Sequence, residues 1–231
     1  MFEKRAAGDR GVTRLFWLES LHTFSYGEFY DPDYPKYRDL RVLNHETIAP
    51  AQGVEAPHRN MEILHYIANG QLEHRDSLGN VRRLGRHGVQ HISAGSGVTH
   101  SEINPSEKEP LELIQIWILP AEKKTPPKYQ GKVYPILEQS GEFVLLASPI
   151  GSNGSLAIGQ DVSIYAAIVE GGSRISFALD GNRHGWVQIL SGAVRLDTLA
   201  LEKGDGVKVA DERIINFEAK ETSEILLFDL K

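Results

Sequence analysis

Histidines are distributed very unevenly along the chain. Eight of the nine lie within the first hundred residues, and only His184 follows them. The chain contains no cysteine, so a bound metal would have to be held by imidazole and carboxylate groups, a donor set that suits Fe, Cu, Ni, Mn or Zn. Metal chemistry is therefore expected in the N-terminal half of the chain.

The segment Gly88–Asn104 carries the most specific of these histidines. Its three glycines, its His100 and its final asparagine fall at the spacing of the second cupin motif. Upstream, His58 and the later Gly70 approximate the first cupin motif, which usually has a His-x-His pair. Position 56 is alanine, so only the second histidine of that pair is present.

His100 and Glu102 can share one face of a strand, because residues i and i+2 of a strand point the same way. A neighbouring strand would supply His58 from across a small β-barrel, whose mouth can enclose a metal and a ligand. The alternative is a cupin that has lost its metal and uses these side chains for internal hydrogen bonds. The other strand histidines are interpreted as ordinary packing residues: His45, His65, His74, His87 and His91.

Further segments resemble the pirin family, and most closely the bacterial pirin-like quercetinases. The resemblance runs along nearly the whole chain, and its most diagnostic part is His100-Ser101-Glu102. The other matching stretches are Leu15–Gly27, Tyr30–Pro32, Leu40–Asn44, Met61–Ile63, His74–Asn80, Ser93–Pro105, Gln115–Ile118 and Glu224–Leu230.

This resemblance implies an all-β bicupin of two jelly-roll-like antiparallel β-barrels, with a mononuclear metal site only in the N-terminal barrel. Pirins bind their metal with three histidines and one glutamate, and His58, His100 and Glu102 match three of those positions. The fourth position falls on Ala56. The cofactor is expected to be one divalent transition metal, Fe(II) first, with Cu, Ni, Mn or Zn as alternatives.

Three arrangements could make up for Ala56. The favoured one is a face of two histidines and one carboxylate with an extra open position, which suits non-haem Fe(II). Glu62 could serve as the replacement if the chain bends between it and His58, and Glu55 could serve if a bulge turns it inward.

The resemblance also implies quercetin 2,3-dioxygenase chemistry, in which a flavonol chelates the metal and O2 breaks its central ring. Glu102 is the expected catalytic residue, because a carboxylate near the metal could take the hydroxyl proton of the substrate. Two alternatives remain open: a pirin-like binding or regulatory protein, and a metal-free cupin that has lost its activity through Ala56.

Short segments rich in Val, Ile, Leu and aromatic residues recur between turn residues, which predicts an all-β fold of antiparallel strands. Asn69-Gly70 and Ser191-Gly192 stand where hairpins must turn, and the similar strands around them indicate a duplicated barrel. The clearest expected strands are Leu40–Leu43, Glu62–Ala68, Gln71–Arg75, Leu111–Leu119, Phe143–Leu146, Ile164–Val169, Trp186–Leu190 and Glu224–Leu230.

Residues 120–134 lack strand periodicity and contain three prolines, which indicates an interdomain linker over residues 121–134. We therefore expect an N-terminal cupin domain with the metal site over residues 1–120. A C-terminal cupin domain without a metal site is expected over residues 135–231.

The charge balance bears on the partners. The 231 residues include 25 Lys+Arg and 31 Asp+Glu, a net charge of -6, which argues against direct nucleic-acid binding. There is no signal-like apolar run and no apolar stretch long enough to cross a bilayer, so a cytoplasmic protein without a membrane partner is expected. The expected partners are a small flavonol-like aromatic substrate and O2, and the family resemblance together with closed barrels suggests a monomer.

Overall fold

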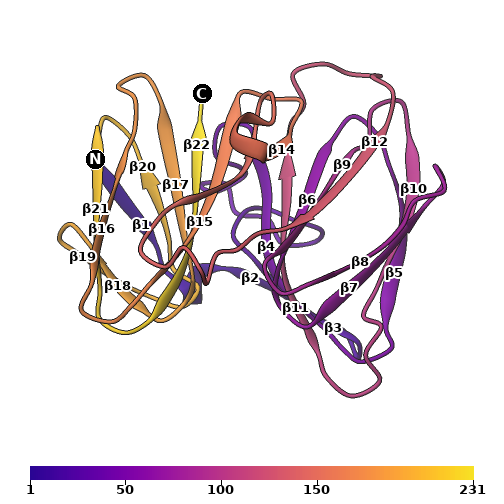
Figure 1. Cartoon of the computed structure of the whole chain (residues 1–231), viewed down its shortest axis with the longest axis horizontal. Coiled ribbons are helices and arrows are strands. Elements are labelled where there is room, and N and C mark those ends of the chain that lie inside the picture. The colour runs from indigo at the N-terminus through magenta and orange to yellow at the C-terminus, as the bar shows by residue number, and fades with distance from the viewer. The chain divides into compact units, whose positions relative to one another are not determined.

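Twenty-two strands account for nearly all the regular structure of the chain, and the all-β prediction is confirmed. The computed structural model describes residues 1–231 and divides into two compact units (Figure 1). The only helical segments are two single turns, η1 (Ala7–Asp9) and η2 (Ser152–Gly154). No helix in the chain is long and apolar enough to cross a membrane.

The N-terminal unit comprises residues 10–134 and 158–160 and is built from two antiparallel sheets. Figure 1 shows the small sheet of this unit on one side and strands of the large sheet on the other. The large sheet has the order β12 (Lys128–Val133), β9 (Gly88–Ser93), β6 (Glu62–Asn69), β11 (Leu111–Ile118), β4 (Leu40–Ile48), β3 (Leu18–His22) and β2 (Gly11–Arg14). The small sheet has the order β5 (Gly53–His58), β10 (Val98–Ile103), β7 (Gln71–Asp76) and β8 (Val81–Gly85).

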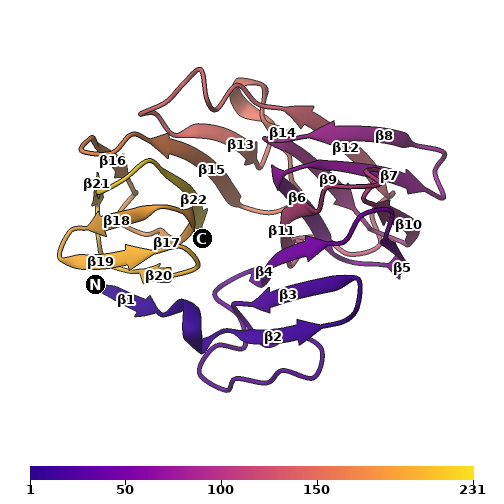
Figure 2. The same cartoon turned by 90° about the horizontal axis from the view of Figure 1, so that it is seen from below.

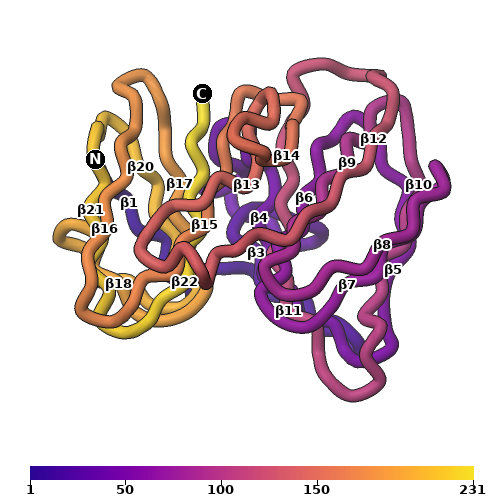
Figure 3. Tube along the Cα trace, in the orientation of Figure 1, coloured from indigo at the N-terminus to yellow at the C-terminus, as the bar shows by residue number.

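The C-terminal unit comprises residues 1–9, 135–157 and 161–231, so both ends of the chain lie in it (Figure 3). Its large sheet has the order β1 (Phe2–Arg5), β20 (Gly206–Val209), β17 (His184–Ser191), β22 (Ser223–Leu230), β15 (Val162–Val169), β13 (Val144–Ser148) and β14 (Leu156–Ala157). Its small sheet has the order β16 (Arg174–Ala178), β21 (Ile214–Ala219), β18 (Ala193–Leu196) and β19 (Leu199–Glu202).

The two units repeat one strand plan. β9, β6, β11 and β4 follow one another in the first large sheet as β20, β17, β22 and β15 do in the second. The order β5-β10-β7-β8 of the first small sheet corresponds to β16-β21-β18-β19 of the second. The duplication indicated by the two Asn/Ser-Gly turns is thus present in the topology.

The glycines of these turns meet a backbone requirement. Gly70 and Gly192, which join a large-sheet strand to a small-sheet strand, have φ of 85° and 80°, where a side chain is strained. A Cβ added at Gly192 would also lie 2.2 Å from Ser223 Oγ. Each glycine therefore allows the chain to pass from one sheet to the other in a tight turn.

The limits of the compact units differ from the predicted domain limits at three places, of which the shortest is residues 158–160 in the N-terminal unit. Residues 128–133 lie within the predicted linker but form β12, which pairs along β9. The first nine residues belong to the C-terminal unit, because β1 pairs with β20, as Figure 2 shows. These last two differences come from edge strands, whose pairing is with residues distant in sequence and leaves little local periodicity.

The alternation of side chains along β6 determines which of them point between the two sheets of the N-terminal unit. Ile63 packs with Ile92 and Val98, and Ile67 packs with a second buried cluster that includes Leu111. The residue between Ile63 and Ile67 on the same face is therefore also directed between the two sheets. That residue is His65.

Candidate metal centre

Strand β10 carries the two predicted ligands that lie closest together. His100 and Glu102 are both buried, with 5% and 4% of their surface exposed. On one side of β10, Ala56 of β5 is the register partner of His100. On the other side, His74 of β7 is the register partner of Glu102. The i, i+2 spacing thus directs both side chains to one face, as predicted.

The Glu102 carboxylate makes three close contacts, all through Oε1. Gln90 Nε2 donates a hydrogen bond to this oxygen at 2.6 Å, and His65 Nδ1 lies 3.0 Å from it. His100 Nδ1 is 3.2 Å away. Gln90 and His65 come from β9 and β6 of the large sheet, where they are register partners. Side chains from both sheets of the N-terminal unit therefore contact the same carboxylate oxygen, Glu102 Oε1.

Neighbouring imidazoles determine the ionisation of this carboxylate. Burial alone would raise the pKa of Glu102, but the charges and hydrogen bond of His65, His100 and His74 outweigh it and lower the pKa to about 2. Burial lowers the pKa of His65 to about 4. Burial also lowers the pKa values of His58 and His74. At neutral pH an ionised Glu102 thus lies among neutral His58, His65 and His74, the protonation states that bind metals.

His58, the third predicted ligand, lies beside this cluster. The centroid of its ring is 5.0 Å from that of His100, and its ring packs edge-on against Trp117 at 5.2 Å. It is more exposed than His100 and Glu102. His74, His100 and Glu102 each offer a ligand atom within 4.8 Å of the others, a group that does not include His58.

His74 belongs to the neighbourhood of Glu102, which its interpretation as an ordinary packing residue did not anticipate. Its Nε2 lies 3.1 Å from Asp76 Oδ2, and its ring is stacked on Tyr129 at 4.2 Å. These contacts fix the orientation of the ring and leave Nδ1 without a hydrogen-bond partner. The sequence signal that was available is the i, i+2 spacing of His74 and Asp76 on one strand.

Two buried imidazole nitrogens near Glu102 have no hydrogen-bond partner, His65 Nε2 and His74 Nδ1, and a third, His100 Nδ1, has only Glu102 Oε1 nearby at 3.2 Å. A buried polar atom left without a partner costs about 1–3 kcal/mol, so several in one place call for a ligand. Neutral imidazoles and an ionised carboxylate are donors that divalent transition metals favour. The residues present therefore fit a metal of the kind the sequence predicted.

A cavity of about 130 Å³ lies next to this cluster. Its polar lining comes from both sheets and includes His58, His65, His100, Glu102 and Glu46. Its aromatic lining comes from Trp17, Tyr26 and Trp117. Ala56 also lines it, so the side chain at this position faces the same space as the predicted ligands. His74 is not among the lining residues.

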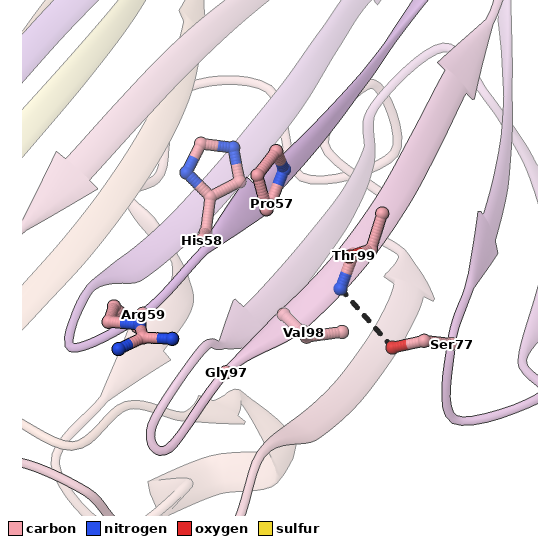
Figure 4. Close-up of a pocket in the computed structure, with 7 residues that line it drawn as sticks. All are labelled: Pro57, His58, Arg59, Ser77, Gly97, Val98 and Thr99. Atoms are coloured by element: carbon pink, nitrogen blue, oxygen red, sulfur yellow. Dashed lines mark hydrogen bonds between the residues drawn. The ribbon is translucent and has the colours of Figure 1, made fainter.

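His58 also borders a wider depression of about 420 Å³. Figure 4 shows His58 and its neighbours Pro57 and Arg59 together with the start of β10, where Ser77 Oγ accepts a hydrogen bond from the Thr99 backbone at 3.2 Å. The residue is thus shared by the inner cavity and this outer depression. Of the predicted ligands, it is the one that borders both spaces.

The two proposed substitutes for Ala56 face elsewhere. Glu62 does not line the cavity: its carboxylate accepts hydrogen bonds from His91 Nε2 at 2.6 Å and Ser93 Oγ at 2.9 Å. Strand alternation accounts for this, because Glu62 lies three positions before His65 and therefore points to the other face of β6. Glu55 is exposed and alternates with Val54 and Ala56, which line the cavity. The chain does bend between β5 and β6, where Asn60 has a φ of 51°, but Glu62 still points away from the cavity, and β5 pairs with β10 without the bulge that Glu55 would need.

Three side chains of the site were not identified from the sequence as functional: His65, Gln90 and Glu46. Glu46 is a buried carboxyl on β4 that accepts a hydrogen bond from Ser20 Oγ at 3.0 Å. Burial, reinforced by the charge of Glu102, raises its pKa to about 7. Alternation along β4 could have indicated that Glu46 points inward, because every second residue from Val42 through Asn44 to Glu46 is buried.

Comparisons with known proteins cover the whole chain. The Pirin family model matches residues 4–118, and a model described as the quercetinase C-terminal cupin domain matches residues 145–230. A quercetin 2,3-dioxygenase of Escherichia coli strain K12 is 38% identical over 231 residues, which cover 100% of this chain and 99% of the relative. A pirin-like protein of Caulobacter vibrioides is 36% identical over 230 residues, covering 99% of this chain and 97% of the relative.

Solved structures agree with these sequence relatives. The crystal structure of YhhW from Escherichia coli matches with a TM-score of 0.95 and 37% identity, covering 100% of this chain and 98% of that chain. A structure of the bacterial pirin YhhW in complex with nickel(II) matches with a TM-score of 0.94 and 37% identity, covering 100% and 99% of the two chains.

Proposed function

The chain belongs to the pirin family, and from that premise we propose that it is a metal-dependent dioxygenase of the quercetin 2,3-dioxygenase type, acting with O2 on a flavonol-like substrate. The observation that carries the proposal is the cluster of buried, unpartnered imidazole nitrogens around an ionised Glu102 beside a cavity. Relatives of similar length named quercetin 2,3-dioxygenase support the substrate class.

His58, His100 and Glu102 would hold the metal, which we propose is Fe(II). When bound, the metal would supply a Lewis-acidic centre for the neighbouring oxygens of the flavonol and for reaction with O2. Glu102 is suited to this task because Gln90 and His65 already hold Oε1, so the carboxylate is fixed in place and its other oxygen carries no protein hydrogen bond.

The flavonol hydroxyl must lose its proton to chelate a metal, and the cavity contains two carboxyls that could accept it. The low pKa of Glu102 makes it a weak acceptor, although it was the residue expected for this step. Glu46 lines the same cavity, and its pKa of about 7 lies near the working pH, where a general base is most effective. We assign proton acceptance to Glu46 and metal holding to Glu102.

The cavity is smaller than the ~300–1,000 Å³ of sites that enclose drug-sized ligands. Binding of a flavonol therefore requires the wall to open. The turn between β2 and β3 is the segment we expect to move, because Phe16 there is 91% exposed and Trp17, which lines the cavity, is only half-buried. The aromatic rings of Trp17, Tyr26 and Trp117 would then pack against the substrate and exclude water.

A second candidate is a pirin-like cupin that binds a small molecule without turning it over. Two features favour it: the small cavity limits the size of the bound molecule, and Ala56 provides no ligand for a metal. The third alternative, a metal-free cupin, would use the same side chains for internal hydrogen bonds, but it leaves His65 Nε2 and His74 Nδ1 without partners.

Metal analysis followed by quercetin turnover separates these functions. Purified protein is analysed for bound metal, stripped with a chelator and reloaded with Fe(II) under anaerobic conditions. Quercetin loss is then followed by absorbance together with O2 uptake. The dioxygenase predicts equal consumption of quercetin and O2 by the loaded protein and none by the stripped protein or by His100→Ala. Metal binding without turnover would support the binding protein, and absence of both would support the metal-free cupin.

A further inference from the structure

His22 is a fully buried histidine that the proposed metal centre does not use. It follows Ser20 by two positions on β3, so both side chains point to the same face of the large sheet. Ser20 and Glu46 are register partners on β3 and β4, and Glu46 lines the cavity. The carboxyl to which we assign proton acceptance therefore has a serine and a histidine beside it on the inner face of its own sheet.

Three side-chain contacts form one row from Glu46 toward the edge of this sheet. Ser20 Oγ donates a hydrogen bond to Glu46 Oε1 at 3.0 Å and lies 3.4 Å from His22 Nδ1. His22 Nε2 lies 2.8 Å from Thr13 Oγ1. Thr13 is half-buried and belongs to β2, the edge strand of the large sheet. The row thus runs from the lining of the cavity to a hydroxyl on the last strand of the sheet.

Each contact in this row has one consistent direction. Because the Ser20 hydroxyl donates its hydrogen to the carboxylate, its oxygen can only accept from His22 Nδ1. His22 Nε2 is then an acceptor and takes the hydroxyl hydrogen of Thr13. Burial lowers the pKa of His22, and the charge of Arg10 adds to this effect, so the ring is neutral at pH 7 with one donor and one acceptor nitrogen.

The neighbours of His22 keep its ring in this orientation. The ring centroid lies 5.0 Å from that of Tyr26. Asn44, the register partner of His22 on β4, donates a hydrogen bond through Nδ2 to Gln115 Oε1 at 3.1 Å. The direction of the His22 Nδ1–H group toward Ser20 is therefore set by packing within the sheet and does not depend on the contents of the cavity.

A directed row matters because a general base must present its carboxylate in a fixed orientation. Ser20 holds Glu46 Oε1, which restricts rotation of the carboxylate and so places the other oxygen for the substrate hydroxyl. In the proton transfer the O–H bond of that hydroxyl breaks, its electron pair stays on the substrate oxygen, and the proton bonds to the Glu46 carboxylate. The row itself neither gains nor loses a proton in this step.

Other ionisable groups also face Glu46 and could alter its ionisation. Those that share its cavity are Tyr26, His58, His65, His100 and Glu102. Burial and the charge of Glu102 oppose ionisation of Glu46, whereas Ser20 and Asn44 beside it favour ionisation. Substitutions confined to the row leave the cavity groups and Asn44 in place, so a change in the ionisation of Glu46 reports on the row.

We propose that Ser20 and His22 are positioning residues for Glu46: His22 directs the Ser20 hydroxyl onto the carboxylate, and Thr13 holds the ring proton of His22 on Nδ1. The inference rests on the proposed function in one respect, the assignment of proton acceptance to Glu46. It gives a role to His22, which lies in the segment Leu15–Gly27 that resembles the pirin family.

The first measurement needs no change to the row. In metal-free protein labelled with 15N-histidine, the chemical shifts of the ring nitrogens distinguish a protonated nitrogen from an unprotonated one, and the spectrum of His22→Phe identifies the signals of His22. We expect the proton of His22 on Nδ1. A proton on Nε2 would overturn the inference, because Ser20 would then receive no hydrogen bond from the ring.

The second measurement follows the ionisation of Glu46 in the same metal-free protein. The carbonyl stretch of the protonated carboxyl, identified by its loss in Glu46→Gln, is titrated by difference infrared spectroscopy. Ser20→Ala should raise the pKa of Glu46 by about 1, the equivalent of one hydrogen bond to a charged group. His22→Phe and Thr13→Val should raise it by a smaller amount, and Thr13→Ser, which keeps the hydroxyl, should give the wild-type value.

Thr47→Val is the matched control for these variants. Thr47 is a half-buried threonine next to Glu46 on β4 that does not line the cavity, so its loss should leave the pKa of Glu46 unchanged. Thermal denaturation verifies that each variant is folded, and His22→Phe and Thr13→Val decide the matter if Ser20→Ala does not fold. An unchanged pKa of Glu46 in folded His22→Phe would overturn the inference, because Ser20 would then act without the ring.

Turnover separates this inference from the proposed function. For Fe(II)-loaded protein acting on quercetin, the acidic limb of kcat/KM against pH should move upward in Ser20→Ala and His22→Phe by as much as the pKa of Glu46 does. A limb that stays in place while this pKa moves would overturn the assignment of proton acceptance to Glu46 and the role of the row with it. Absence of turnover in the wild type would count against the proposed function, whereas the two spectroscopic measurements would still decide whether the row positions Glu46.

Discussion

Replacing Glu46 by glutamine should change how the stability of the metal-free protein depends on pH. The pKa of the Glu46 carboxyl is about 7 in the folded protein, against an ordinary value of 4.5. A group whose folded pKa is raised contributes its full stability below the unfolded pKa and loses it as the pH rises through the folded pKa. Folding therefore becomes less favourable between about pH 4.5 and 7, because Glu46 is ionised in the unfolded chain and must take up a proton to be buried.

The magnitude follows from the two pKa values. Linkage gives a loss of about 2.5 kcal/mol in the free energy of unfolding from pH 5 to pH 8 for this group alone. Glutamine keeps an oxygen to accept the hydrogen bond from Ser20 and cannot ionise. The variant should thus be more stable than the wild type at pH 8, and the difference should shrink by about 2.5 kcal/mol at pH 5.

Urea denaturation of chelator-treated protein at pH 5, 6, 7 and 8 measures this difference. Glu107→Gln is the matched control, since it removes an exposed loop carboxyl and should leave the pH profile of the wild type unchanged. His65, whose pKa is lowered to about 4, gives a pH dependence of opposite sign, so only the difference between wild type and variant is informative. Parallel profiles for wild type and Glu46→Gln would refute the assignment of a raised pKa to Glu46.

Three further predictions concern the site and its surroundings. His100→Ala should lose bound metal by elemental analysis while keeping its circular dichroism spectrum, and near-stoichiometric metal in this variant would remove His100 from the centre. Ala56→His should lose metal to a chelator more slowly than the wild type, because residue 56 lines the cavity; an equal rate would show that an imidazole there does not reach the metal. Glu62→Gln should lower the free energy of unfolding in urea by about 1 kcal/mol, because a neutral amide oxygen replaces the charged acceptor of the hydrogen bonds from His91 and Ser93, and metal content should not change. A loss of metal in Glu62→Gln with little loss of stability would contradict the placement of Glu62 on the outer face of β6.

Local patterns were sufficient for the parts of the fold that depend on neighbouring residues. Alternating and apolar runs predicted strands such as Glu62–Ala68, now within β6, and the turns at Gly70 and Gly192 followed from their tolerance of positive φ. The pairing of His100 with Glu102 on one face followed from the i, i+2 rule alone.

The features that could not be predicted depend on how segments distant in the sequence are brought together, as when the two sheets of a unit face each other. His65 lies in an apolar run where a single histidine is usually a packing residue, and its distance to Glu102 is set by the approach of two sheets, which no local period encodes. Glu46 lies on β4 of the large sheet and lines the same cavity for the same reason. β12 is an edge strand with mostly exposed residues, so its pairing with β9 could not be distinguished from a linker by composition.

The pairing of β1 with β20 has a consequence for how the protein is made. β1 leaves the ribosome about 200 residues before β20 does, since its partners lie at residues 206–209. At ~5–20 residues per second, β20 is translated roughly 10 to 40 s after β1, so β1 has no strand to pair with during that time. During that time the N-terminal unit, whose own strands are contiguous from β2 to β12, can be translated and begin to fold. Translation order therefore separates the two halves in time, and the first strand synthesised can pair only after nearly all of the chain has been translated.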